Sequence, residues 1–193
     1  MCSECYNKKV TMTAKKPKMS KDTLLPLLAG HVLAHGMGGA SLRPMAKSAG
    51  TSDRMLLYHF GSKEQLLAEL LQFLADAYSA ALDTNFRTEP VRDRHDCIKR
   101  ISDHMAQPAT APFMALWWEI VAGCARGQKG YQDAASAMMD RLLEWLVDHM
   151  PADDPDPQAG ARYVLTVIEG AQMLKTIGRE SIAQDGIASS RLI

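Results

Sequence analysis

The sequence predicts an all-α fold in which a small three-helix head precedes a longer helical-bundle body. Apolar residues recur at intervals of three and four along most of the chain, which is the spacing of one face of a helix. No stretch alternates apolar and polar residues with the period of a strand. Prolines and glycines separate the periodic segments. We therefore expect a tail over residues 1–19, a head over 20–66 and a body over 67–193.

The composition is that of a globular chain. Its 193 residues suffice for one compact body and a small extra domain, and 47% of them are apolar. No uninterrupted apolar run approaches the roughly 18–20 residues that a membrane span needs. The amino terminus lacks the apolar core of a secretory signal. We expect a cytoplasmic protein without membrane contact.

The net charge of zero conceals an asymmetry between the two ends of the chain. Residues 1–65 hold ten Lys and Arg against four Asp and Glu, which leaves twelve basic against eighteen acidic residues in the remainder. A basic end suits a polyanion such as DNA. Six of the ten basic residues lie within residues 8–21, so a basic tail that arose by chance explains the excess equally well.

The tail is polar and lysine-rich without periodicity, and we expect it to be disordered. The first helix is expected over residues 23–35, with Pro26 in its first turn, where the missing N–H costs nothing. Gly36 is expected to end it.

Two short helices follow and form a helix-turn-helix pattern. The second helix is expected over residues 41–48 with Ser41 as its cap, and the third begins after Ser52 and runs to about His59. Between them Gly50 can supply the positive φ of a tight turn. Small apolar residues suit the crossing of the two helices, and polar or adaptable ones suit a face that enters a DNA groove. The expected crossing residues are Met45, Ala46, Ala49 and Leu56; the expected protruding residues are Asp53, Arg54, Met55 and Tyr58.

A fourth helix is predicted to begin at Ser62, where Ser62 and Gln65 have the spacing of a capping box, and to reach about residue 81. Five more helices complete the expected body, and they are placed over residues 92–106, 112–125, 129–149, 157–178 and 180–190.

Residues 41–52 and 56–67 resemble the second helix, the turn, the recognition helix and the start of the fourth helix of the tetracycline-repressor (TetR) family. The resemblance is close from about Leu24 to Leu71, and the later helices match in number, length and order only. Leu57 departs from the Tyr usual in the family, and Thr51 from the usual Val. The resemblance implies DNA contacts by eight residues: Ser41, Arg43, Ser52, Arg54, Met55, Tyr58, His59 and Lys63.

Aromatic and methionine side chains of the body suit a malleable apolar pocket for a small molecule. Each of them alone is better explained as core. The expected ligand-binding residues are Met114, Trp117, Trp118, Met138, Met139 and Met173. For Glu119, which interrupts this apolar segment, contact with solvent or a helix is favoured over contact with a ligand.

The helix over residues 157–178 carries a long apolar stripe and is the expected dimer helix, with an internal core helix as the alternative. The stripe consists of Val164, Val167, Ile168, Ala171, Leu174 and Ile177. Gly170 would allow close approach of a second helix, and it is an expected dimer residue together with the first five of the stripe. Glu169-Gly170 is similar to an acidic-glycine pair common in the dimerising helix of the family.

The expected function is that of a ligand-responsive regulator, most simply a repressor, that binds a palindromic operator as a homodimer and is released by a small, mostly apolar effector. The alternative is a helical small-molecule-binding or interaction protein with a vestigial helix-turn-helix. We expect no enzyme, cofactor or metal site, since no catalytic or metal-binding pattern stands out. His31 and His35, four residues apart, are interpreted as core or boundary residues. Cys97 and Cys124 are interpreted as core residues, and Cys2 and Cys5 as incidental thiols.

Overall fold

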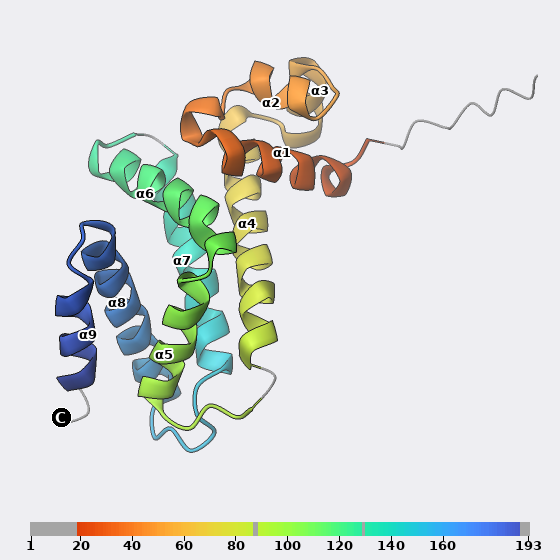
Figure 1. Ribbon diagram of the computed structural model, residues 1–193. Helices are drawn as coiled ribbons and strands as arrows, with labels where there is room; N and C mark the ends of the chain where they lie inside the picture. The colour runs from red at the N-terminus through yellow and green to blue at the C-terminus, as the bar shows by residue number, and fades with distance from the viewer. Residues whose placement is uncertain (1–18, 87–88, 129, 190–193) are drawn as a thin grey trace, which may run out of the picture.

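The computed structural model describes residues 19–86, 89–128 and 130–189, and every regular element in these ranges is helical (Figure 1). The all-α prediction is confirmed. The predicted tail, residues 1–19, lies outside the described residues except for its last residue. Cys2 and Cys5 lie wholly outside them. The head contains α1 (Lys21–His35), the 3-10 turn η1 (Met37–Gly39), α2 (Leu42–Ser48) and α3 (Asp53–Phe60).

The body follows as a bundle. Its elements are α4 (Lys63–Phe86), α5 (Arg94–Met105), the 3-10 turn η2 (Pro108–Thr110), α6 (Ala111–Ala125), α7 (Tyr131–Asp148), α8 (Pro157–Thr176) and α9 (Glu180–Ser189). The helix ends lie close to the expected ones, because prolines and glycines set them. In the described residues no helix is both long and apolar enough to cross a membrane.

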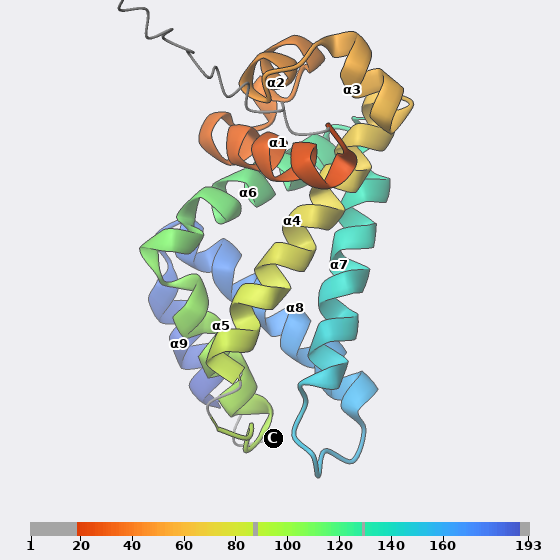
Figure 2. The same ribbon diagram turned by 90° about the vertical axis from the view of Figure 1, so that its right-hand side faces the viewer.

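Helix α4 joins the head to the body. Its 24 residues run from beneath α3 down the length of the bundle, beside α7 (Figures 1 and 2). The N–H of Gln65 donates to Ser62 Oγ at 3.1 Å, as the capping pattern at the start of this helix predicts. The expected domain boundary at residue 66 therefore falls inside one continuous helix, so a displacement of its lower end can reach the head.

The head and the body also share one hydrophobic core. Leu28 of α1 and Leu56 of α3 belong to the same buried cluster as Trp117 of α6 and Met138 of α7. A second cluster lies lower in the bundle, between the far half of α4 and helices α5, α7 and α8. The head is consequently packed onto α6 as well as joined to α4.

The start of α1 differs from the expected one. The Thr23 hydroxyl accepts the N–H of Ser20 at 3.0 Å, and this cap starts the helix at Lys21. Pro26 therefore lies inside the helix, and its expected place in the first turn was wrong. Its ring removes one helical hydrogen bond, which would otherwise reach the carbonyl of Asp22.

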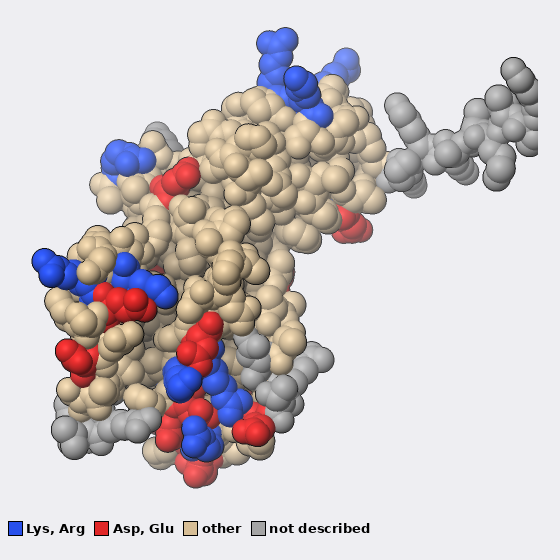
Figure 3. Space-filling view, in the orientation of Figure 1, with Lys and Arg blue, Asp and Glu red and all other residues tan. Residues whose placement is uncertain are grey.

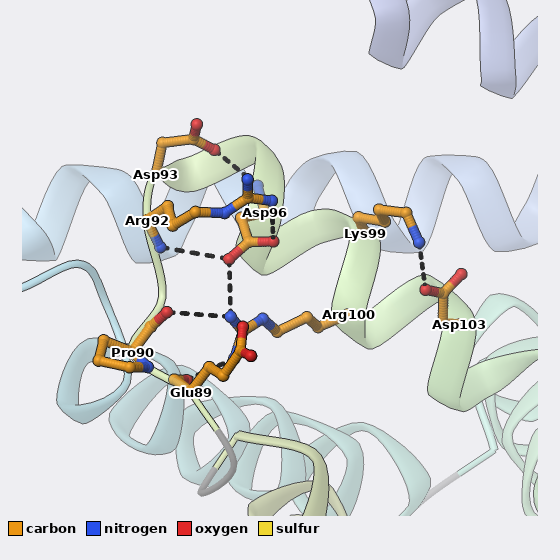
Figure 4. A network of polar contacts seen from close by, with 8 residues as sticks. All are labelled: Glu89, Pro90, Arg92, Asp93, Asp96, Lys99, Arg100 and Asp103. Atoms are coloured by element: carbon orange, nitrogen blue, oxygen red, sulfur yellow. Dashed lines mark hydrogen bonds and ion pairs between the residues drawn. The ribbon is translucent and has the colours of Figure 1, made fainter.

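A network of charges fixes the corner between α4 and α5 (Figure 4). The Asp96 carboxylate accepts from Arg92 at 3.0 Å and from Arg100 at 2.9 Å. Arg100 also donates to the carbonyls of Glu89 and Pro90, at 2.7 and 2.9 Å. Hydrogen bonds from Arg92 lead the contributions that hold the pKa of Asp96 at about 2, although burial opposes them. This buried carboxylate anchors the incoming loop to α5.

Candidate nucleic-acid interface and body cavity

The turn between α2 and α3 has the tight geometry that the sequence predicts. Gly50 adopts a φ of 65°, a region that side chains disfavour. The N–H of Thr51 donates back to the carbonyl of Ala46 at 2.9 Å, which closes the turn. Met45, Ala46 and Leu56 are at most 1% exposed, so the expected crossing residues do hold α3 against α2.

The first turn of α3 presents an open face. Ser52 caps the helix, and its Oγ accepts the N–H of Met55 at 3.3 Å. Tyr58 is 78% exposed and Arg54 is also exposed, although Leu56 between them is fully buried. The 3.6-residue period thus separates a bracing face from a free one. A helix with this free face has the dimensions and chemistry to enter a DNA major groove.

Basic side chains surround this face. Arg43 and Lys47 on α2, Arg54 on α3 and Lys63 at the start of α4 are all exposed. In the view of Figure 3, Lys and Arg gather on the end of the head over α2 and α3, whereas the body shows both signs of charge. Lys47 was not among the expected contacts. Its place one helical turn after Arg43 was the available signal.

Two of the expected DNA contacts are arranged less simply. Ser41 occupies the cap position of α2, but its side chain makes no cap hydrogen bond. His59 is half-buried, and its Nε2 is covered without a hydrogen-bond partner among the described residues. Its ring stands edge-on to Tyr58, with centroids 5.3 Å apart. His59 must therefore rotate before its Nε2 can reach a phosphate.

The six expected ligand-binding residues do not gather around one cavity. Trp117 and Met138 are buried in the core shared with the head, and Met114 and Met139 pack against it. Met173 is 48% exposed on α8. The apolar pattern of these four residues of α6 and α7 is explained by the core that the head and the body share.

Trp118 lines a shallow groove where the head meets the body, together with Met37, Glu119 and Tyr131. Glu119 Oε2 accepts the N–H of Met37 at 2.7 Å. Gly36 approaches the same carboxylate so closely that a Cβ there would overlap it. Glu119 therefore contacts another element, as expected, and ties α6 to the end of α1.

The bundle contains a different apolar cavity of about 30 Å³ between α4, α5, α7 and α8. Leucines, Ile101 and Trp145 provide most of its wall. Two residues with polar groups, Tyr78 and Glu169, also line it. Glu169 accepts the indole N–H of Trp117 at 3.1 Å, and burial raises the pKa of its carboxyl. This pair was not predicted from the sequence, because an acid inside an apolar helix was interpreted as part of a dimer face.

Helix α8 has two apolar faces, and the expected dimer residues fall on both. Val164 and Ile168 are buried in the protomer's own second core, so they cannot form a surface between protomers. Val167, Ala171 and Leu174 are half-buried, and Gly170 is exposed. The outward face carries Gly170 and Ile177, which the sequence analysis placed on this helix, and Tyr163 and Met173, which were not expected at a dimer face. These four residues are three, four or seven positions apart.

The histidine pair of α1 makes backbone contacts. His31 Nε2 lies 3.2 Å from the carbonyl oxygen of Gly39, and His35 Nδ1 lies 2.9 Å from that of His31. Within the described residues no three His, Cys, Asp or Glu are grouped to hold a metal. Cys97 is buried, and burial raises the pKa of its thiol to about 12, whereas Cys124 is half-buried.

A helix-turn-helix head with a basic tip, packed on a helical body, defines a class of DNA-binding proteins. Residues 31–70 match the family model described as bacterial regulatory proteins, tetR family. Over these residues, from the second half of α1 to the start of α4, the chain is similar to this family. It is 36% identical over 76 residues to the HTH-type transcriptional repressor KstR2 of Mycolicibacterium smegmatis. That match covers 37% of this chain and 37% of the repressor, so the chain spans little more than a third of this curated relative.

Solved structures share the fold over most of the chain. A Streptomyces coelicolor A3(2) protein named as a transcriptional regulator superposes with a TM-score of 0.66 at 24% identity, covering 87% of this chain and 95% of that one. Reduced NemR of E. coli superposes with a TM-score of 0.64 at 17% identity, and the match covers 90% of this chain and 96% of NemR. The multidrug binding protein EbrR, complexed with imidazole, superposes with a TM-score of 0.61 at 16% sequence identity, and the match covers 90% of this chain and 89% of EbrR. At these identities the likeness shows the fold.

Proposed function

We propose that this protein is a DNA-binding transcriptional repressor that acts as a homodimer on a palindromic operator and is released by a small, mostly apolar effector. The exposed, Ser52-capped face of α3 within a ring of basic side chains is the observation that carries the proposal. Ser52 and the first N–H groups of α3 face outward, where they suit a phosphate. Arg54 would reach base edges, preferably guanine, and Arg43 and Lys63 would bind phosphates.

The outward face of α8 supports the homodimer. Met173 is 48% exposed and Ile177 is 65% exposed, and both lie on a helix whose opposite face is already buried. Ile182 on the neighbouring α9 is a further exposed apolar side chain, at 55%. Helices α8 and α9 lie side by side on one flank of the bundle (Figure 1). Two such flanks would pair as a four-helix bundle, and the two heads would then read two half-sites related by symmetry.

The body cavity supports an effector. It lies against α4, the helix that continues into the head, and its volume of about 30 Å³ holds little more than water. A larger molecule must therefore separate the surrounding helices, and displacement of α4 would change the position of α3. The effector then lowers DNA affinity by its preference for the displaced state.

The alternative, a small-molecule-binding protein with a vestigial helix-turn-helix, would also fit the cavity. The intact cap at Ser52 and the exposed Tyr58 and Arg54 favour DNA binding. A helix-turn-helix that no longer binds DNA would not require a capped helix with a basic, exposed face. The proposed role is regulatory rather than catalytic.

The direct test is selection of duplexes from a random-sequence library by the purified full-length chain. We expect an inverted repeat to be enriched, and its two halves to be bound by one dimer. The double variant Arg54→Ala/Tyr58→Ala, which changes only exposed side chains, should not enrich it. Recovery of unrelated sequences by both proteins would contradict the proposal.

A further inference from the structure

The cavity in the body contains a polar pair whose hydrogen-bonding capacity is not used by the described residues. Tyr78 is 9% exposed, and its hydroxyl is buried without a hydrogen-bond partner among them. Its ring is held in place by Phe113, stacked at 4.4 Å between centroids. A buried hydroxyl left without a partner is unfavourable unless something else satisfies it. Since Tyr78 lines the cavity, a bound molecule can do so.

Glu169 lines the same cavity, and none of the described residues that form the lining is basic. The indole N–H of Trp117 donates to one of its carboxyl oxygens at 3.1 Å. His104 stands edge-on to Tyr78, and burial lowers the pKa of its imidazole, which disfavours a positive charge there. A carboxylate in an apolar cavity is costly without an opposite charge.

The rest of the wall is apolar and aromatic. Trp145 faces the cavity, and its own N–H is already bonded to Asp83 at 2.7 Å, so its ring is fixed and offers no donor. Aromatic faces beside an acidic group attract cations. Within the part of the chain that the structure describes, the cavity thus combines one acid, one hydroxyl available to a ligand, and aromatic surface.

We propose that this cavity takes an apolar molecule with one protonated amine, paired with the Glu169 carboxylate and hydrogen-bonded to the Tyr78 hydroxyl. This inference rests on the proposed function, in which a small molecule bound in the body releases DNA, and it names the chemical class of that molecule. The amine supplies the missing positive charge, and the apolar part fills the space that opens between α4, α5, α7 and α8.

The test compares two compounds of equal shape, 2-phenylethylamine and 2-phenylethanol, by calorimetry and tryptophan fluorescence on the full-length protein. We expect the amine to bind at least about tenfold more tightly than the alcohol, because only the amine forms a charge-assisted hydrogen bond with Glu169. Equal binding of the two compounds, or no binding of either, would overturn the proposal.

The variant Glu169→Gln keeps an oxygen for the Trp117 N–H and removes the charge. It should lower the affinity for the amine to that for the alcohol and leave the alcohol unchanged. Glu144→Gln, which removes an exposed acid on α7, is the matched control and should leave both affinities unchanged. A preference for the amine that survives Glu169→Gln would refute the role of Glu169. If Glu169→Gln does not fold, the difference in affinity between the amine and the alcohol on the unaltered protein still tests the proposal.

The pH dependence gives a second readout. Because burial raises the pKa of Glu169, its carboxyl gains a proton as pH falls, and affinity for the amine should fall with it while affinity for the alcohol stays constant. The other titratable groups that face the site are Tyr78 from α4 and His104 from α5. The groups from the remaining helices do not titrate in this range: they are the Trp117 N–H of α6 and the Trp145 and leucine side chains of α7. His104 would add repulsion when it protonates, and it does so equally in Glu169→Gln, which isolates the contribution of Glu169.

Operator binding in the same preparations separates the two proposals. If the chain binds its selected operator but shows no preference for the amine, the inference about the cavity fails and the proposed function stands. If it prefers the amine through Glu169 but binds no DNA specifically, the proposed function fails and the chemistry of the cavity stands.

Discussion

The Glu119 carboxylate on α6 and the backbone N–H of Met37 in the head form a 2.7 Å hydrogen bond across 82 positions of the sequence. The contact lies directly after α1, where Gly36 turns with a φ of 67°. It complements the shared core, because α6 also contributes Trp117 to the packing beneath the head. Trp117 in turn donates to Glu169 at the body cavity. Helix α6 therefore contacts both the cavity and the head.

Glu119→Ala should loosen the junction. Removal of a charge-assisted hydrogen bond at an exposed position costs about 1 kcal/mol locally, so the amides of residues 37–39 should exchange about fivefold faster. Hydrogen exchange followed by mass spectrometry measures this. Glu119→Gln keeps an acceptor oxygen and should retain most of the protection. If Glu119→Ala exchanges as slowly as the unaltered protein, the contact does not hold the junction.

The buried carboxylate of Asp96 should make stability depend on acid pH. Its pKa is lowered from 3.8 to about 2, so the folded state favours the ionised form. The stabilisation is therefore present above about pH 4 and is lost as pH falls toward about 2. Asp96→Asn should cost about 2 kcal/mol of unfolding free energy at pH 7, and this difference should shrink toward about pH 2.

Urea unfolding between pH 7 and pH 2 measures this difference. Asp103→Asn is the matched control, because Asp103 forms an ion pair with Lys99 on the same helix at 2.6 Å, but both side chains are more than 60% exposed. Removal of this exposed pair should cost less than about 1 kcal/mol. Equal effects of the two substitutions would contradict the importance of burial at Asp96.

Much of the fold follows from local sequence signals. Ser52, Gly50 and the prolines mark helix ends through backbone chemistry that is independent of distant residues, and the helices lie where these signals put them. Pro26 shows the limit, because a cap by Ser20 and Thr23 starts α1 earlier than the apolar periodicity suggested. The exposed face of α3 could also be predicted. Leu56 was expected to be buried, and on a helix one buried position is enough to fix which residues point outward.

The body sites depend on tertiary packing and could not be predicted in the same way. An apolar stripe shows that a face is buried, but it does not show against what. Trp117 and Met138 pack beneath the head, and Val164 and Ile168 pack inside the protomer, although their patterns would equally suit a ligand pocket or a dimer face. Glu169 and Tyr78 are 91 positions apart in sequence, and only the tertiary packing of the bundle brings both to one cavity.

Arg54→Ala should relax base preference at one symmetric pair of operator positions. The substitution should cost about 1–3 kcal/mol of binding free energy for each base edge that the Arg54 guanidinium binds. Competition between the selected operator and duplexes altered at single base pairs measures this. Asp53→Ala, a neighbouring change in the first turn, serves as a control that removes no positive charge. Unchanged preference at every position in Arg54→Ala would exclude base reading by this residue.

Lys63→Ala should weaken binding to all duplexes alike. A lysine that neutralises a phosphate releases about one counterion, so the slope of log affinity against log salt should fall by about one for each protomer. Arg179→Ala removes an equal charge from an exposed position of the body and should leave the slope unchanged. Equal slopes for the two variants would place Lys63 outside the DNA interface.

Gly170→Leu should dissociate the dimer without unfolding the protomer. A Cβ at Gly170 meets nothing within 4 Å inside the protomer, and the residue is exposed on the outward face of α8. A leucine there adds volume only to a contact between protomers, where overpacking costs about 1–3 kcal/mol, so the dimer dissociation constant should rise about fivefold to more than a hundredfold. Gly30→Leu is the matched control, because Gly30 on α1 is also exposed and an added Cβ there also meets no atom within 4 Å. Both substitutions replace a helical glycine and therefore favour helix formation. Sedimentation over a range of concentrations measures the constant. A dimer that is equally stable in both variants would show that the outward face of α8 is not the interface.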